Sequence, residues 1–366
     1  MGDERKMILQ MLHDGKITAE EAERLLKVLN EPAAEQKVEE KSKPSEAPPS
    51  EFVDWKGWEN RKQSYKQASG GLKISQYIES FIQKLKDVDF DFNFGTYETV
   101  NHIFQDHPEE VNRIEVDVKN GSVEFSPWDE DFVQVDCEVK VYKVASKDEA
   151  REKFIRETLF ETVNHKLLFA CEPRDMKVTA TIYIPKKTYE SIDLSIFNGD
   201  MNGQVFKAKN LHAKTVNGSI TFQGLDVEKA ELETGNGTIS VEGKAEDIEL
   251  ETLNGPIKAV GAFRDLDAET FSGLITAKLS EPGVISLKST TGNVRVSVPK
   301  HMQINGELVT AFGSLNCEVG SFEVLREKKE MAQRLLKFVS NKSSTSILTL
   351  EANTKTGAIT VTEQEG

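Results

Sequence analysis

The sequence predicts a mainly β protein, a β-solenoid with helical insertions and caps that follows a small α-helical hairpin. Two observations support this prediction. Turn pairs of the Asn-Gly type recur every 18–21 residues over much of the chain. Apolar and polar residues also alternate at fixed offsets from each turn glycine, which is the pattern of a half-buried strand.

The repeat is anchored on the turn glycines. They are Gly199, Gly218, Gly237, Gly255, Gly273, Gly292 and Gly313. Apolar residues recur seven and five positions before each glycine and two positions after it, except that Gly306 takes one of the apolar positions. Gly121 and Gly357 fit the same template. Each unit is therefore a strand, a tight turn and a second strand.

Two architectures are compatible with this repeat. In a β-solenoid each unit is one coil, and equivalent residues stack at the interstrand spacing of about 4.8 Å. In a meander each Asn-Gly pair closes an antiparallel hairpin. We favour the solenoid, because hairpin registers would not require the same class of side chain at every offset.

The remaining segments are placed in chain order. Residues 1–30 have two short apolar stripes around Asp14-Gly15-Lys16, which predicts a helical hairpin. Residues 31–71 form a Pro-, Glu- and Lys-rich linker. Residues 72–109 hold an amphipathic helix, over 72–88, and the N-terminal cap. The solenoid domain then covers 110–366.

Two insertions interrupt the predicted coils, at 126–190 and 321–346. The first contains strand-like runs around a helix expected from Lys147 to Thr162. The second is rich in Glu, Lys, Arg, Leu and Met, which predicts a helix over 322–339. Because open solenoid ends expose strand edges and core, we expect the helices at 72–88 and 322–339 to cover them.

The repeated Thr-x-Asn-Gly-x-Ile pattern, together with the helical insertion, resembles the YvlB/LiaG-like β-strand-repeat family of adhesin-type bacterial proteins. The leading Asp-Gly-Lys-Ile-Thr-x-x-Glu-Ala motif is similar to a SHOCT-like helical module. The resemblance implies a right-handed, single-stranded β-solenoid and an association with cell-envelope stress responses. It implies no catalytic residues.

Composition and charge exclude several functions. The 366 residues carry a formal net charge of −15 without a block of Lys and Arg, which argues against nucleic-acid binding. Cys137, Cys171 and Cys317 lack CxxC spacing, so we expect buried thiols and no zinc site. There is no secretory signal and no run of about 18 apolar residues. We therefore expect a cytoplasmic protein. The helix at 72–88 could alternatively make peripheral contact with the inner face of the membrane instead of capping the solenoid.

Three successive coils each carry two acidic residues on the outward side of the strand before the turn, and we call this set the acidic face. Its members are Glu231, Glu233, Glu249, Glu251, Asp267 and Glu269. Stacked like charges repel each other. Three interpretations stay open, namely a solvated surface, a docking surface for a basic partner, and a site for a hard cation such as Ca²⁺.

The turn residues are expected to be structural, with stacked amides that bond coil to coil and hydroxyl ladders from the neighbouring Thr column. This turn ladder comprises Asn198, Gly199, Asn217, Gly218, Asn236, Gly237, Asn254, Gly255, Gly273 and Gly292. Nucleotide-binding and common hydrolase motifs do not occur, and we expect no cofactor. A paired-carboxylate glycosidase would need a partly desolvated cleft, which a flat strand surface does not offer.

These observations predict a non-enzymatic binding or scaffold protein. The solenoid face and the tethered hairpin at 3–30 would contact protein partners, or the hairpin would self-associate. The alternative is an adhesin-like solenoid at the envelope or cell surface that binds carbohydrate or protein. A carbohydrate-active β-helix enzyme ranks below both.

Overall fold

A computed structural model describes residues 95–107, 110–204, 206–330 and 333–364. The predicted hairpin at 1–30, the linker at 31–71 and the helix at 72–88 lie outside the described residues. Within them the chain is almost entirely strands, with one α-helix, α5 (Lys147–Glu157).

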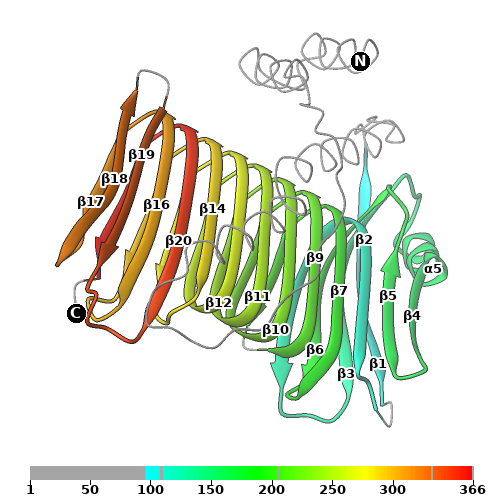
Figure 1. Cartoon of the computed structure of the whole chain (residues 1–366). Coiled ribbons are helices and arrows are strands. Elements are labelled where there is room, and N and C mark those ends of the chain that lie inside the picture. The colour runs from blue at the N-terminus through cyan, green and yellow to red at the C-terminus, as the bar shows by residue number, and fades with distance from the viewer. Residues whose placement is uncertain (1–94, 108–109, 205, 331–332, 365–366) are drawn as a thin grey trace, which may run out of the picture. The chain divides into compact units, whose positions relative to one another are not determined.

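A stack of parallel coils forms the body of the domain (Figure 1). Its strands are β7 (Thr188–Asn198), β8 (Met201–Gln204), β9 (Lys207–Asn217), β10 (Ile220–Asn236), β11 (Ile239–Asn254), β12 (Ile257–Ser272), β13 (Ile275–Leu279), β14 (Val284–Thr291) and β15 (Val294–Val298). Ile220, Ile239 and Ile257 lie side by side in register and are at most 1% exposed. The parallel register confirms the solenoid and excludes the meander.

The side chains beside each turn tie neighbouring coils together. The Asn236 amide donates to the side-chain oxygen of Asn217 at 3.0 Å, and Asn254 donates to Asn236 at 3.0 Å. The expected amide ladder is therefore confirmed. The expected hydroxyl ladder is wrong, because Thr234 donates instead to the backbone carbonyl of Gly218 in the preceding coil, at 2.8 Å. Each buried hydroxyl thus finds an acceptor one coil away.

The chain order departs from the spatial order at the C-terminal end of the stack. The strands there are β16 (Gln303–Phe312), β17 (Leu315–Glu318), β20 (Ile347–Thr356) and β21 (Ile359–Glu363). β20 pairs with both β14 and β16, and β21 pairs with both β15 and β17. The last coil of the sequence therefore lies inside the stack, between the coils of Gly292 and Gly313.

The helix predicted over 322–339 is wrong, because this segment forms the antiparallel strands β18 (Phe322–Glu330) and β19 (Gln333–Ser340). β19 also pairs with β16, which places Phe338 opposite Gly306. Phe338 is fully buried, and a Cβ atom on Gly306 would come within 2.2 Å of its ring. The missing apolar side chain of the repeat is thus supplied by the insertion, and this packing outweighs helix propensity.

The N-terminal end combines the two strands before the other insertion with the strands of that insertion. Its strands are β1 (Tyr97–Asp106), β2 (Arg113–Trp128), β3 (Val133–Tyr142), β4 (Thr158–Val163), β5 (Lys166–Cys171) and β6 (Met176–Pro185). β2 lies between two coils, because it pairs with β5 and β6 on one side and with β7 and β8 on the other. β5 and β6 therefore form the outermost coil at this end. β3 pairs with β6, and β1 with β3.

The predicted helix from Lys147 to Thr162 is confirmed in its first part only. The Ser146 hydroxyl accepts from the Glu149 amide and caps α5, which buries Ala150 and Phe154 against the sheet. The ring of Phe154 lies 5.8 Å from that of Phe104 in β1. Residues 158–163 form β4 instead, because they pair with β5.

Candidate functional site

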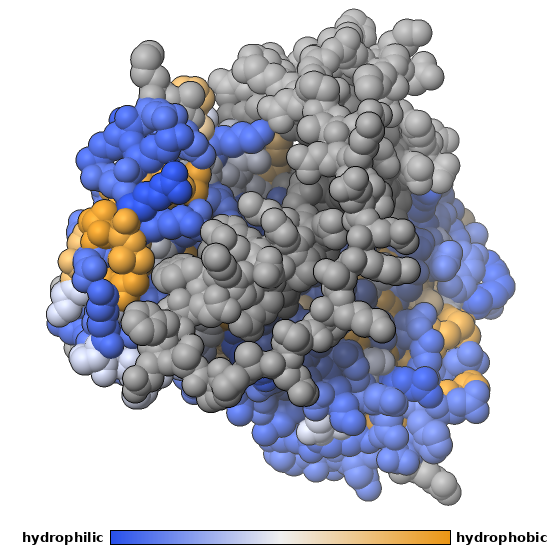
Figure 2. Space-filling view, viewed as in Figure 1, coloured by the Kyte–Doolittle hydropathy of each residue, from blue (hydrophilic) through white to orange (hydrophobic). Residues whose placement is uncertain are grey.

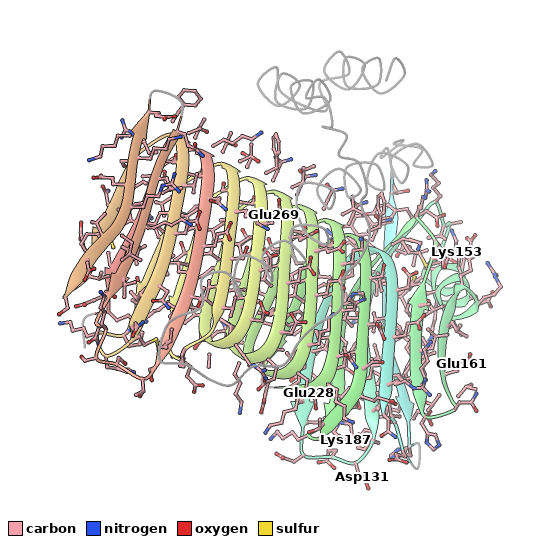
Figure 3. All side chains as sticks on the ribbon, viewed as in Figure 1. Asp131, Lys153, Glu161, Lys187, Glu228 and Glu269 are labelled. Atoms are coloured by element: carbon pink, nitrogen blue, oxygen red, sulfur yellow. The ribbon has the colours of Figure 1, made fainter. Side chains whose placement is uncertain are left out.

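The register of β9–β12 and β14 brings the six carboxylates of the acidic face together. Glu231, Glu249 and Asp267 occupy one column across three neighbouring coils, and Glu233, Glu251 and Glu269 occupy the parallel column two residues further along. Glu269 is labelled on this face in Figure 3. The sequence-predicted grouping is therefore confirmed, although no comparison tests its role.

The acidic columns continue into the first coils, beyond the six residues predicted from the sequence. Glu115 of β2 pairs with Asp193 of β7, which in turn pairs with His212. Asp117 occupies the neighbouring column. The signal was available, because Glu115, Asp117 and Asp193 stand at the same offsets from Gly121 and Gly199 as the carboxylates that were recognised.

Basic side chains border the acidic face on both sides. His212 Nε2 lies 2.5 Å from a carboxylate oxygen of Glu231, and Lys214 forms an ion pair with Glu233. On the other side, Lys288 Nζ lies 3.7 Å from a carboxylate oxygen of Asp267. The positive charges thus contact the first and last of the three acidic coils.

The central coil carries the strongest electrostatic perturbation. Burial, a hydrogen bond with Glu249 and the neighbouring carboxylates raise the pKa of Glu251 to about 8. Burial and a hydrogen bond with Glu233 also raise the pKa of Glu231, against the opposing effect of His212. At neutral pH the Glu251 carboxyl therefore holds a proton that an isolated carboxylate would have released.

Two grooves adjoin the acidic face. One has a volume of 280 Å³ and is lined by Asp117, Asp193, His212 and Glu231, among others. The other has a volume of 560 Å³, and its lining includes Glu269 and residues of β16, β18, β19 and β20. An extended segment lying along the face would have a depression at each end.

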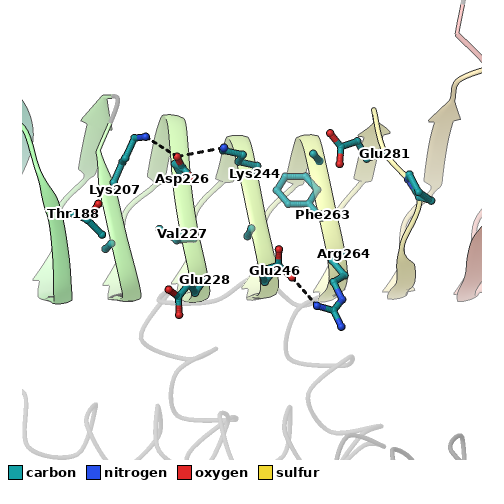
Figure 4. Close-up of a pocket in the computed structure, with 14 residues that line it drawn as sticks. Thr188, Lys207, Asp226, Val227, Glu228, Lys244, Glu246, Phe263, Arg264 and Glu281 are labelled. Carbon is teal, nitrogen blue, oxygen red and sulfur yellow. Dashed lines mark hydrogen bonds and ion pairs between the residues drawn. The ribbon is translucent and has the colours of Figure 1, made fainter. Parts of the chain in front are cut away.

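A third groove, of 380 Å³, lies at another corner of the coils (Figure 4). Asp226 lies between Lys207 and Lys244, with oxygen–nitrogen distances of 3.1 and 3.4 Å. Burial raises the pKa of Asp226, but the two lysines outweigh that effect and leave it lowered. Arg264 pairs with Glu246 at 2.8 Å. Because these charges compensate one another, this groove offers less electrostatic attraction than the acidic face.

No group of three or more His, Cys, Asp or Glu side chains among the described residues is arranged to hold a metal ion. The described part of the chain also contains no helix long and apolar enough to cross a membrane. The turn ladder from Asn198 to Gly292 lies beside the turns and serves coil-to-coil bonding. The stacked carboxylates and the two adjoining grooves make the acidic face the candidate binding site.

The raised pKa of Glu251 makes stability depend on pH. A carboxyl whose pKa is higher in the folded than in the unfolded state favours folding at low pH, and this contribution is lost as pH rises from about 4.5 to about 8. We expect Glu251→Gln to be as stable as the wild type at pH 4 and about 1–2 kcal/mol more stable at pH 8.5, after allowance for screening. Urea unfolding at both pH values measures this. The control is Glu242→Gln, an exposed position on the strand after the turn. If the stability of the two variants changed identically between the two pH values, the prediction would be contradicted.

The fold and the acidic face define a class of protein, a β-solenoid repeat protein with a charged strand surface. The chain belongs to the Toastrack DUF4097 family, whose model matches residues 111–362. A SHOCT-like domain model matches residues 3–33. The resemblances seen in the sequence are thus confirmed.

The relatives include Uncharacterized protein YvlB of Bacillus subtilis (strain 168), which is 33% identical over 380 residues, or 98% of each chain. A solved "putative adhesin" of Bacteroides fragilis is 14% identical and covers 73% of this chain and 97% of its own, with a TM-score of 0.37. One from Parabacteroides distasonis is 11% identical, with coverages of 72% and 97% and a TM-score of 0.37. These descriptions name no enzyme activity.

Proposed function

We propose that the chain is a non-enzymatic binding and scaffold protein whose acidic face docks a basic partner. The in-register stacking of six carboxylates is the observation on which this proposal rests. Like charges held opposite one another on a sheet are unfavourable, and the neighbouring carboxylates add to burial and the hydrogen bond with Glu249 in raising the pKa of Glu251. A cationic partner would relieve the repulsion on binding.

The geometry also suggests the form of the partner. Neighbouring carboxylates in a column are separated by the interstrand spacing of about 4.8 Å. An extended segment rich in Lys and Arg could place successive cations against Glu233, Glu251 and Glu269.

A second contact would come from the SHOCT-like domain at residues 3–33. We propose that this domain binds a partner or a second copy, so that engagement of one contact raises the effective concentration of the other. We further propose envelope-stress signalling as the process, which the family resemblance suggests. Induction of the protein by a cell-wall antibiotic would test that assignment, and unchanged expression would contradict it.

Binding of a labelled octalysine peptide to the full chain tests the role of the acidic face. We expect the triple variant Glu233→Lys, Glu251→Lys and Glu269→Lys to bind at least tenfold more weakly in fluorescence anisotropy at low salt. The control is Glu228→Lys, Glu246→Lys and Glu281→Lys, which makes the same charge change around the corner groove. Equal losses in the two triple variants would show a net-charge effect and contradict the proposed site.

A further inference from the structure

The C-terminal end of the solenoid is stepped. The sheet that contains β16 continues by two strands past the coil of Gly313, which is the outermost coil at this end. β19 pairs with β16, and β18 pairs with β19. The sheet that contains β17 stops at the last coil, because β17 pairs with β21 alone among the described strands. One wall of the solenoid thus overhangs the other.

The step exposes apolar side chains. Phe322 and Val324 of β18 are 38% and 45% exposed, and the ring of Phe322 lies 5.2 Å from that of the buried Phe338. Leu315 and Cys317 of β17 pack against the core but are only partly buried. Figure 2 shows hydrophobic atoms gathered at the left-hand end, where β17–β19 lie. The core is therefore incompletely covered at this end.

The backbone of β17 presents a strand edge at which a further strand could pair. In each earlier coil, the amide two positions after the turn glycine donates to the next coil, as Val294 does to Ala358 and Ile359 to Ser314. Leu315 is the last member of this series, and no coil follows it in the described part of the chain. The carbonyl groups of an added strand beside β17 would accept hydrogen bonds from the backbone amides of this edge. The added strand would also pack on the overhanging face of β18 and β19.

We propose that a second copy of this chain occupies the step. A two-fold axis parallel to the strands would place the overhanging β18 of each copy beside β17 of the other, antiparallel to it. The two overhangs would interlock, pair both exposed edges and cover both apolar faces. Such a closed, isologous contact is the usual form of a homodimer.

Charge complementarity favours the second copy. Glu318 of β17 and Arg326 of β18 are both exposed, and neither forms an ion pair within the described ranges. In the interlocked arrangement the carboxylate of one copy faces the guanidinium of the other, twice by symmetry. β17 and β18 would thus supply opposite charges at the two edges that meet.

The predicted amphipathic segment at 72–88 is a less suitable occupant. Only residues 89–94 separate it from Gly95, a tether of about 20 Å at full extension. β1 lies at the opposite end of the stack, and nine coils at about 4.8 Å place the step about 40 Å away. The tether is too short to lay this segment across the step.

Disulfide trapping in the full chain tests the contact directly, whatever residues 1–94 contribute to association. In a Cys317→Ser background, a mixture of Glu318→Cys and Arg326→Cys chains should form linked dimers on mild oxidation, whereas either variant alone should not. Glu124→Cys, at the equivalent strand of the first coils, replaces Glu318→Cys in the control mixture. Trapping in the control mixture to the same extent, or none in the test mixture, would overturn the proposal.

A charge exchange supplies a second readout. Arg326→Glu and Glu318→Arg should each weaken dimerisation about tenfold by sedimentation, and the double variant should restore it. Arg295→Glu, on the wall of a coil two positions from the end, should leave the dimer intact. Because all three residues are exposed, an unchanged far-UV circular dichroism spectrum is expected and would show that the variants fold. A double variant as weak as the single variants would contradict the proposed pairing.

Discussion

Gly255→Ala, in one of the turns, should cost at least about 3 kcal/mol of stability. A Cβ atom at this position would lie 1.9 Å from the carbonyl oxygen of Gly237, in the backbone of the preceding coil. Neither atom can move without breaking the coil register. The φ angle of +154° adds strain for any residue with a side chain. Urea unfolding of the full chain, monitored by far-UV circular dichroism, measures the loss.

Gly95→Ala separates the two causes. Gly95 also has a positive φ, of +65°, but a Cβ atom there would meet nothing within 4 Å. It therefore reports the cost of the αL conformation without a close approach, about 1 kcal/mol, which is a lower bound for the conformational cost at φ +154°. If Gly255→Ala were no more destabilising than Gly95→Ala, the close coil-to-coil approach would not be what requires glycine at the turn.

Phe338→Ala should cost about 3–5 kcal/mol, the range expected when a buried aromatic side chain leaves a cavity. Phe338 is fully buried, and its ring fills the space left by Gly306 in the coil of Gly313. Its loss should detach the hairpin of β18 and β19 from β16. Chemical denaturation measures the cost, and hydrogen exchange of the β19 amides should show local opening.

Gly306→Leu provides the compensating substitution. In the wild-type background it should destabilise the protein, because its Cβ atom would come within 2.2 Å of the Phe338 ring. In the Phe338→Ala background it should restore a substantial part of the lost stability, since it returns the apolar side chain that the repeat lacks. Additive losses in the double variant would contradict direct contact between the two positions.

The repeat made the central coils and the acidic face predictable. Residues at one offset from each turn glycine share a chemical class because each stacks on the same position of the coil before it. Ile220, Ile239 and Ile257 illustrate this for the core, and Glu233, Glu251 and Glu269 for the surface. The same pattern extends to Glu115 and Asp193 in the first coils.

The insertions were less predictable, because their structure depends on what they contact. Residues 322–339 contain good helix formers, but pairing with β16 and the space above Gly306 favour strands. Thr158–Val163 likewise joins β5 where a longer helix was expected. In both cases a sheet edge outside the segment offered hydrogen bonds that local propensity does not reflect.

The sequence by itself determined the coil, its inward and outward residues and the turn chemistry, because these properties repeat locally and each repeat reports on the others. The tertiary structure alone decided that the last coil of the chain lies inside the stack, between the coils of Gly292 and Gly313. Coils that share one template present equivalent edges, so sequence order does not fix stacking order. The coil of Gly313 is suited to the end of the stack because the hairpin of β18 and β19 pairs with its strand β16 and places Phe338 over Gly306.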